Sequence, residues 1–148
     1  MRRRLAIALT VLACVAVLPL LTGFAKGEQA FRGTVYLGMD TPLTGPQAVV
    51  GQGDRETVTA LVNYWNSRGG IKGRRVVVDV LDNASNPSQG VQNVQRFIGE
   101  SKYAGILGSG NAAAAVATAP LATQGQIPFI ALSPPTTIVQ PPRSFVYV

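Results

Sequence analysis

Three segments supply glycines, hydroxyl groups or a possible helix start, and these features are suited to holding a small polar ligand. They are residues 41–51, 108–112 and 133–137. In residues 108–112 (Gly-Ser-Gly-Asn-Ala), the glycines allow a ligand to approach the backbone closely, and the unpaired N–H groups of a helix start favour an anionic group. The other two segments add threonine and serine hydroxyls. Any one of the three could be a simple turn, but together they predict a binding site.

Other chemistries are less well supported by the residues. Gly108-x-Gly110-x-x-Ala113 fits a dinucleotide-binding fingerprint, which also needs an acidic residue about 20 positions later. Residues 101–148 contain no Asp or Glu, so nicotinamide binding is disfavoured. Asp79 and Asp82 could form a carboxylate pair, but we expect Asp79 in a strand and Asp82 in the turn after it. The chain has no His, no Walker A or G-x-S-x-G motif and no Cys/His cluster. We therefore expect no enzyme activity, no cofactor and no metal.

The elements that must position these segments follow from hydrophobic periodicity. Four short apolar runs predict strands, and their nearly continuous hydrophobicity is typical of parallel strands buried on both faces. The runs are residues 34–39, 75–81, 103–107 and 128–132. A further apolar segment, residues 145–148, follows a proline-rich loop and predicts the start of another strand.

Three helices are predicted between the strands. The first spans about residues 54–67 and ends at Gly69-Gly70, and its apolar stripe consists of Val58, Leu61, Val62 and Trp65. The second begins with Asn86 as N-cap and Pro87 in the first position. The stripe of this second helix consists of Val91, Val94, Phe97 and Ile98. The third, residues 111–124, is rich in alanine, and Pro120 predicts a kink or a restart.

The alternation of strands and helices predicts an α/β fold, with an open parallel sheet and helices on both faces. In such a sheet all strands end at the same edge, where ligands bind. The three candidate segments follow strands, so they should share that edge.

The N-terminus predicts export. Arg2, Arg3 and Arg4 precede an uncharged apolar run over residues 5–21, and Gly23-Phe24-Ala25 provides small residues for cleavage. We predict a signal peptide over residues 1–25 and a periplasmic mature chain over residues 26–148; a retained membrane anchor is the alternative. Cys14 lies inside the run, so the mature chain would contain no cysteine.

The basic character of the chain comes partly from this N-terminal segment. Removing it lowers the count of Lys plus Arg from 13 to ten, against 7 acidic residues. The remaining chain has no long basic stripe with interleaved aromatic residues, which argues against nucleic-acid binding.

Several motifs carry a family resemblance over residues 34–148. They include Leu43-Thr44-Gly45-Pro46, the stretch Gly-Gly-Ile-Lys-Gly-Arg at residues 69–74, Asn86-Pro87 and Ile127-Pro128-Phe129-Ile130. In this order they resemble the N-terminal lobe of periplasmic solute-binding proteins of the branched-chain amino acid (Leu/Ile/Val) type of ABC transporter.

The resemblance implies a type I periplasmic-binding-protein fold, in which two lobes close over a small ligand and present it to an ABC permease. The chain would be part of the first lobe, truncated, with the second lobe absent. The resemblance implies amino acids or related small carboxylates as ligands. A ligand-sensing ectodomain of a membrane receptor with the same fold is the alternative function. The ligand-binding residues it implies are Thr44, Val50, Ser109, Gly110, Asn111, Ala112, Ser133, Pro134 and Thr136.

Two positions depart from the family pattern. Ala112-Ala113-Ala114 occupy the helix start where amino-acid binders commonly have a serine or threonine, which would remove one hydrogen bond to a ligand carboxylate. Val50 stands where an aromatic residue often forms a wall of the site. These departures favour aromatic or short-chain carboxylates over an ordinary branched-chain amino acid.

Overall fold

The computed structural model describes residues 30–133 and 135–148. Residues 31–148 form a compact unit of their own. The predicted signal peptide, residues 1–25, and Pro134 lie outside the described residues. Within the described ranges, no helix combines the length and apolar character needed to cross a membrane.

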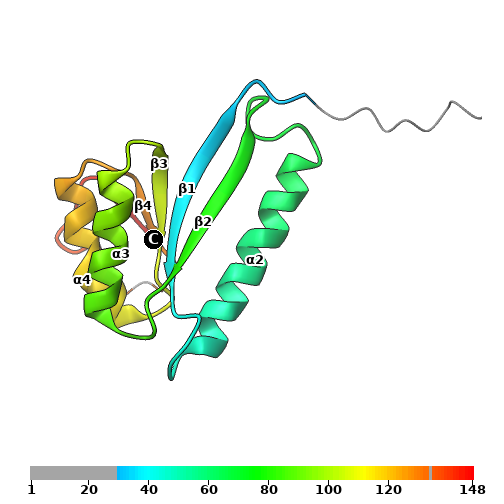
Figure 1. Ribbon diagram of the computed structural model, residues 1–148. Helices are drawn as coiled ribbons and strands as arrows, with labels where there is room; N and C mark the ends of the chain where they lie inside the picture. Colours follow the sequence, from blue (N-terminus) through cyan, green and yellow to red (C-terminus); the bar gives the residue numbers. More distant parts are fainter. Residues whose placement is uncertain (1–29, 134) are drawn as a thin grey trace, which may run out of the picture. The chain divides into compact units, whose positions relative to one another are not determined.

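The unit is built on a five-stranded parallel sheet in the order β2-β1-β3-β4-β5 (Figure 1). The strands are β1 (Thr34–Thr41), β2 (Arg75–Asp82), β3 (Tyr103–Gly108), β4 (Phe129–Ala131) and β5 (Val146–Tyr147). The predicted strands are confirmed, with ends that shift by one or two residues. β1 and β2 pair along their full length, from Thr34 opposite Arg75 to Thr41 opposite Asp82. This register brings the ends of β1 and β2 side by side at the carboxyl edge of the sheet.

Helices cover both faces of the sheet, as predicted. α3 (Pro87–Gly99) and α4 (Ala112–Gln124) lie on one face, and α2 (Ala48–Asn66) lies on the other (Figure 1). The Asn86 side chain caps α3 by accepting a hydrogen bond from the Ser88 N–H at 2.9 Å, with Pro87 in the first position. α4 runs through Pro120 without the restart that its sequence allows. Because proline has no N–H, the carbonyl group of Val116, four residues earlier, lacks its usual helical donor.

α2 begins at Ala48, earlier than the predicted start near Asp54. Gln47 makes no side-chain cap, and glycines at positions 51 and 53 disfavour a helix, so the local sequence gives no signal for a helix start at Ala48. Packing stabilises the first turn instead: Gly51 is buried, and a Cβ there would overlap the backbone of Pro42. The loop after β1 is therefore shorter than predicted, and Val50 lies on the first turn of α2.

The main core lies between the sheet and the pair α3 and α4. Its largest fully buried members are Val94, Phe97, Ile106, Phe129 and Ile138, each at most 1% exposed. This core fixes β3 and β4, and with them the loops that follow these strands.

The α2 side is packed more loosely. The predicted stripe of α2 faces the sheet, but an apolar cleft of about 350 Å³ lies beneath it, and Trp65 is 45% exposed. α2 is fastened at its far end by Asn66, whose side chain exchanges two hydrogen bonds of 2.8 Å with the backbone of Val76. Together with Gly51 against Pro42, this holds α2 at both ends above the cleft.

Candidate ligand-binding site

A buried hydrogen-bond network lies beneath the carboxyl edge of the sheet. The Asp40 carboxylate, near the end of β1, accepts hydrogen bonds from the Nδ2 groups of Asn83 and Asn93, both at 2.8 Å. Asp40 and Asn83 are fully buried. Burial raises the pKa of Asp40 above its ordinary value, although these two amide hydrogen bonds oppose the shift. The network joins β1, the end of β2 and α3.

Ser109 connects this network to the loop after β3. Its Oγ accepts hydrogen bonds from Asn83 Nδ2 and from the Asn111 N–H, both at 3.0 Å. The Ser109 side chain is fully buried, so it supports the loop from below and is not on the surface. The sequence singled out Ser109 as a ligand contact; in this structure its oxygen is used inside the fold.

Asn111 forms the start of α4. Its Oδ1 accepts hydrogen bonds from the N–H groups of Ala113 and Ala114, at 2.9 and 3.3 Å. Among the described residues, the N–H groups of Gly110 and Ala112 find no acceptor. Ala112 is also exposed. Two unpaired backbone donors therefore remain at this helix start, where the helix dipole favours a negative group.

Thr44 is held by Asp82. The Asp82 carboxylate accepts hydrogen bonds from the N–H groups of Leu43, Thr44 and Ala84, and from Thr44 Oγ1 at 2.6 Å. Desolvation acts to raise the pKa of Asp82, but these hydrogen bonds outweigh it and hold that pKa below its ordinary value. The Thr44 hydroxyl is thus engaged within the fold, while its side chain lies at the surface.

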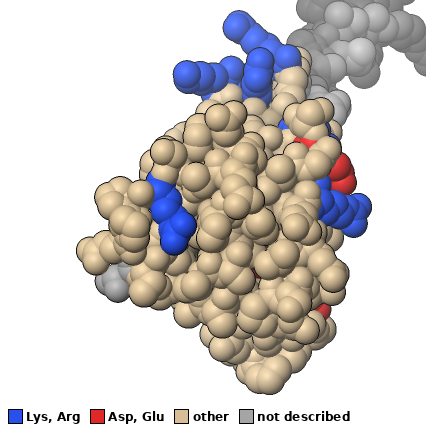
Figure 2. All heavy atoms as spheres, turned by 90° about the vertical axis from the view of Figure 1, so that its left-hand side faces the viewer, with Lys and Arg blue, Asp and Glu red and all other residues tan. Residues whose placement is uncertain are grey.

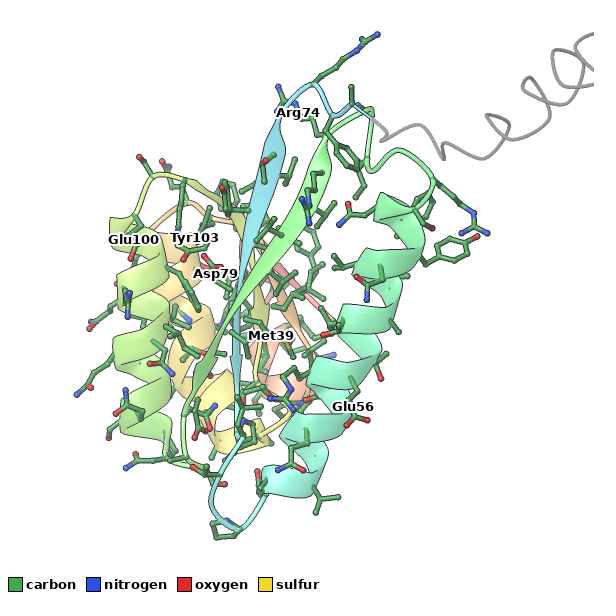
Figure 3. The ribbon with its side chains drawn as sticks, turned by 45° about the vertical axis from the view of Figure 1, so that its right-hand side comes forward. Met39, Glu56, Arg74, Asp79, Glu100 and Tyr103 are labelled. Atoms are coloured by element: carbon green, nitrogen blue, oxygen red, sulfur yellow. The ribbon has the colours of Figure 1, made fainter. Side chains whose placement is uncertain are left out.

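Asp79 and Asp82 do not form a carboxylate pair. Asp79 accepts hydrogen bonds from Lys102 Nζ at 3.0 Å and Tyr103 Oη at 2.8 Å (Figure 3). Asp82 is the last residue of β2 and not part of the turn after it, which corrects the predicted boundary. The two carboxylates serve different parts of the fold.

Gly110 packs directly against α2. A Cβ at Gly110 would overlap the Asp54 carboxylate and the Val50 side chain. Asp54 accepts a hydrogen bond from Thr41 Oγ1 at 3.2 Å, and partial burial raises its pKa. Val50 is 50% exposed beside this contact. The structure therefore brings Val50, Gly110, Asn111 and Ala112 together and adds Asp54 to them.

The third candidate segment follows β4. Gly108 pairs with Ala131, so Gly110 and Ser133 lie equally far beyond the ends of neighbouring strands. Ser133 is half-buried, and Thr136 begins the short 3-10 helix η2 (Thr136–Ile138). Pro134 lies outside the described residues. The register places this segment at the same edge as the α4 start.

Sequence reasoning missed Asp40, Asp54, Asn83 and Asn93. A charged residue at the end of an apolar strand signals a buried partner, and this signal was available for Asp40. Asp54 lies on a helix in contact with a loop more than fifty residues away, and no local pattern indicates that contact.

The family is shown by comparison with known proteins. A model of the periplasmic binding protein family matches residues 34–148. A Leu/Ile/Val-binding protein homologue of Brucella abortus is 30% identical over 108 residues, which cover 72% of this chain and 28% of the relative. The chain therefore belongs to the periplasmic binding protein family.

Solved structures agree on the fold. A type 1 periplasmic binding protein from Bordetella pertussis Tohama I matches with a TM-score of 0.67 at 30% identity, covering 73% of this chain and 29% of that one. A solute-binding protein of an ABC transporter from Rhodopseudomonas palustris BisB5, solved with 3,4-dihydroxybenzoic acid, matches with a TM-score of 0.66 at 29% identity over 76% and 31%. The fold is thus a partial lobe of the type I class, as the resemblance implied. The chain spans less than a third of the length of these relatives.

Proposed function

We propose that this chain forms part of the ligand-binding lobe of a periplasmic receptor that delivers amino acids or related small carboxylates to an ABC permease. The observation that carries the proposal is that the N–H groups of Gly110 and Ala112, at the start of α4, have no acceptor among the described residues. Backbone donors at a helix start bind carboxylates without needing a cationic side chain. The lobe would hold its ligand without covalent chemistry.

The proposed contacts follow from where the residues lie. Gly110 and Ala112 bind the ligand carboxylate through their backbone, Asn111 fixes the helix start, and Val50 provides an apolar wall. Thr44, Ser133 and Thr136 border the same edge, and Pro134, which the resemblance also implies, lies outside the described residues. Ser109 acts indirectly, because its hydroxyl holds the loop in place.

Asp54 adds a requirement on the ligand. Its carboxylate lies against Gly110, so an anion with no other polar group would meet an acidic neighbour. A ligand that carries both a carboxylate and a hydrogen-bond donor satisfies both groups, because the donor can bind Asp54. Amino acids have an ammonium group and hydroxylated aromatic acids have a phenolic hydroxyl, so both classes meet this requirement.

Transport would depend on the rest of the receptor. A ligand that contacts two lobes favours their closed arrangement, and closure is what a permease can distinguish from the empty state. The names of the relatives support amino acids and aromatic acids as candidate ligands, and the departures at Val50 and Ala112 favour aromatic or short-chain carboxylates over leucine.

The proposal is tested by titrating the chain with leucine, 3,4-dihydroxybenzoate and leucinamide while following backbone amide resonances. We expect the Gly110 and Ala112 resonances to move with the two carboxylates, more strongly with 3,4-dihydroxybenzoate, and not with leucinamide. NMR titration suits this chain because it detects the weak binding expected of an incomplete site.

Two substitutions at one position make the test sharper. Ala112→Pro removes one N–H group at the first helix position, which proline tolerates, and Asn111 already has the extended backbone that precedes a proline. Ala112→Ser keeps the N–H and adds a hydroxyl. A hydrogen bond to a charged group is worth about 1.5–3 kcal/mol, so Ala112→Pro should weaken carboxylate binding at least about tenfold. Ala112→Ser should strengthen it. Equal affinity in all three proteins would refute the proposed contact.

A further inference from the structure

A group of cations lies at the end of the unit opposite the candidate ligand site. We call this surface the basic end and define it by Arg32, Lys72, Arg74 and Arg75, all of them exposed. Figure 2 shows basic side chains gathered there, and Figure 3 places Arg74 where β1 and β2 begin. Ion pairs in the described part of the chain involve Arg96 and Lys102 and none of these four residues.

Three of the four cations line one hollow. It has a volume of about 450 Å³, and its described lining residues, Arg32, Val35, Ile71, Lys72 and Arg74, include no acidic side chain. Ile71 is 48% exposed. Like charges that share a hollow repel one another unless an anion neutralises them, so this surface is suited to an anionic partner.

Backbone hydrogen bonds fix the spacing of these cations. Arg32 donates its N–H to the Gly73 carbonyl at 2.8 Å, and Arg75 donates to Gly33 at 2.8 Å. Ile71 and Arg74 exchange two backbone hydrogen bonds of 2.9 and 3.0 Å. The turn at residues 71–74 is therefore tied to the segment that leads into β1, and the charges are presented together.

We propose that the basic end binds anionic phospholipid headgroups at a membrane surface. Guanidinium groups pair with phosphate oxygens in a bidentate manner, and an exposed isoleucine between cations suits the boundary between headgroups and acyl chains. The exposed apolar side chain of Ile71 among the cations favours a membrane surface over an acidic protein as the partner.

The geometry keeps this contact separate from ligand binding. The basic end lies at the amino ends of β1 and β2, and the candidate ligand loops lie at the carboxyl edge. β1 has eight residues, which span about 26 Å at the usual rise of a strand. A membrane at the basic end therefore leaves the ligand edge free.

The experiment is sedimentation of the full chain with vesicles of phosphatidylcholine, with and without phosphatidylglycerol. The test variant is Lys72→Gln/Arg74→Gln, and the matched control is Arg55→Gln/Arg96→Gln, which loses the same charge elsewhere. Each cation near an anionic surface changes affinity about fivefold, so the test variant should bind anionic vesicles about 25-fold more weakly. The control should change less than about twofold, because distant charges are screened at physiological salt. All proteins keep the N-terminal run, so its own contribution is equal.

Several outcomes would overturn the proposal. Equal losses in both variants would show that only net charge matters, and equal binding to neutral vesicles would show that the cations are not involved. If inorganic phosphate at matched ionic strength shifts the amide resonances of Arg32 and Gly73 while the test variant still binds vesicles, the hollow is an ion site and not a membrane surface. No solute is present in these assays, so they fail or succeed independently of the proposed receptor function.

Discussion

The substitution Ser109→Ala tests whether Ser109 supports the candidate site from within the fold or contacts the ligand directly. The substitution deletes the oxygen that accepts hydrogen bonds from Asn83 Nδ2 and the Asn111 N–H, in a place without solvent. A buried donor left without an acceptor costs about 1–3 kcal/mol. Two such donors predict a loss of about 2–6 kcal/mol in the free energy of unfolding, which is a large part of the total stability of a small domain.

The assay is urea unfolding followed by circular dichroism, with Ser101→Ala as control. Ser101 is exposed in a turn, so its substitution should change the free energy of unfolding by less than about 0.5 kcal/mol. Amide exchange adds a local measure: the Asn111 N–H should exchange faster in Ser109→Ala than in the parent chain. The reasoning is refuted if Ser109→Ala keeps the parental stability and Asn111 protection but loses carboxylate binding, since Ser109 would then be a ligand contact.

Two further predictions concern acidic and tightly packed positions. Because burial raises the pKa of Asp40 above 3.8, its charged form costs stability at neutral pH, and this cost disappears as the pH falls through the raised pKa. As the pH is lowered from neutral to about 4, the parent chain should therefore gain stability relative to Asp40→Asn. Urea unfolding of both proteins at several pH values measures this, and a difference in unfolding free energy that stays constant with pH would contradict it. Gly110→Ala should lower the unfolding free energy by about 1–3 kcal/mol, because its Cβ overlaps Asp54 and Val50. The control is Gly53→Ala in α2, where a Cβ would meet open space, and it should raise the unfolding free energy by about 0.5–1 kcal/mol. Similar melting temperatures for the two variants would count against the close packing of Gly110 on α2.

The sequence predicted the strands and the second helix because the responsible signals are local. The apolar runs of β1 to β4 and the Asn86-Pro87 start of α3 are each contained in a few neighbouring residues. The start of α2 could not be predicted in this way, because the contact of Gly51 with Pro42 overrides a weak local helix preference.

The candidate site also contains one feature that local sequence predicts and one that depends on distant contacts. The helix start at Asn111 was predicted from its own segment, and the structure shows the cap. Ser109 is buried beside Asn83, which follows β2 and donates a hydrogen bond to it, and Asn83 in turn donates to Asp40 of β1. Residue type indicated that Ser109 has a hydroxyl, but only the fold shows that both of its acceptor positions are occupied from within.

The way α2 is fastened has a consequence for how the protein can vary. The helix is pinned near Gly51 and at Asn66, and its middle bridges a partly filled apolar space. Val58 and Leu61 line this space near the middle of α2, so they can exchange for other apolar residues at modest cost, since a loosely filled space tolerates changes of volume. Substitutions in the middle of α2 therefore need not disturb its two attachment points, so the sheet edge that carries the candidate site can stay constant while the middle of α2 varies.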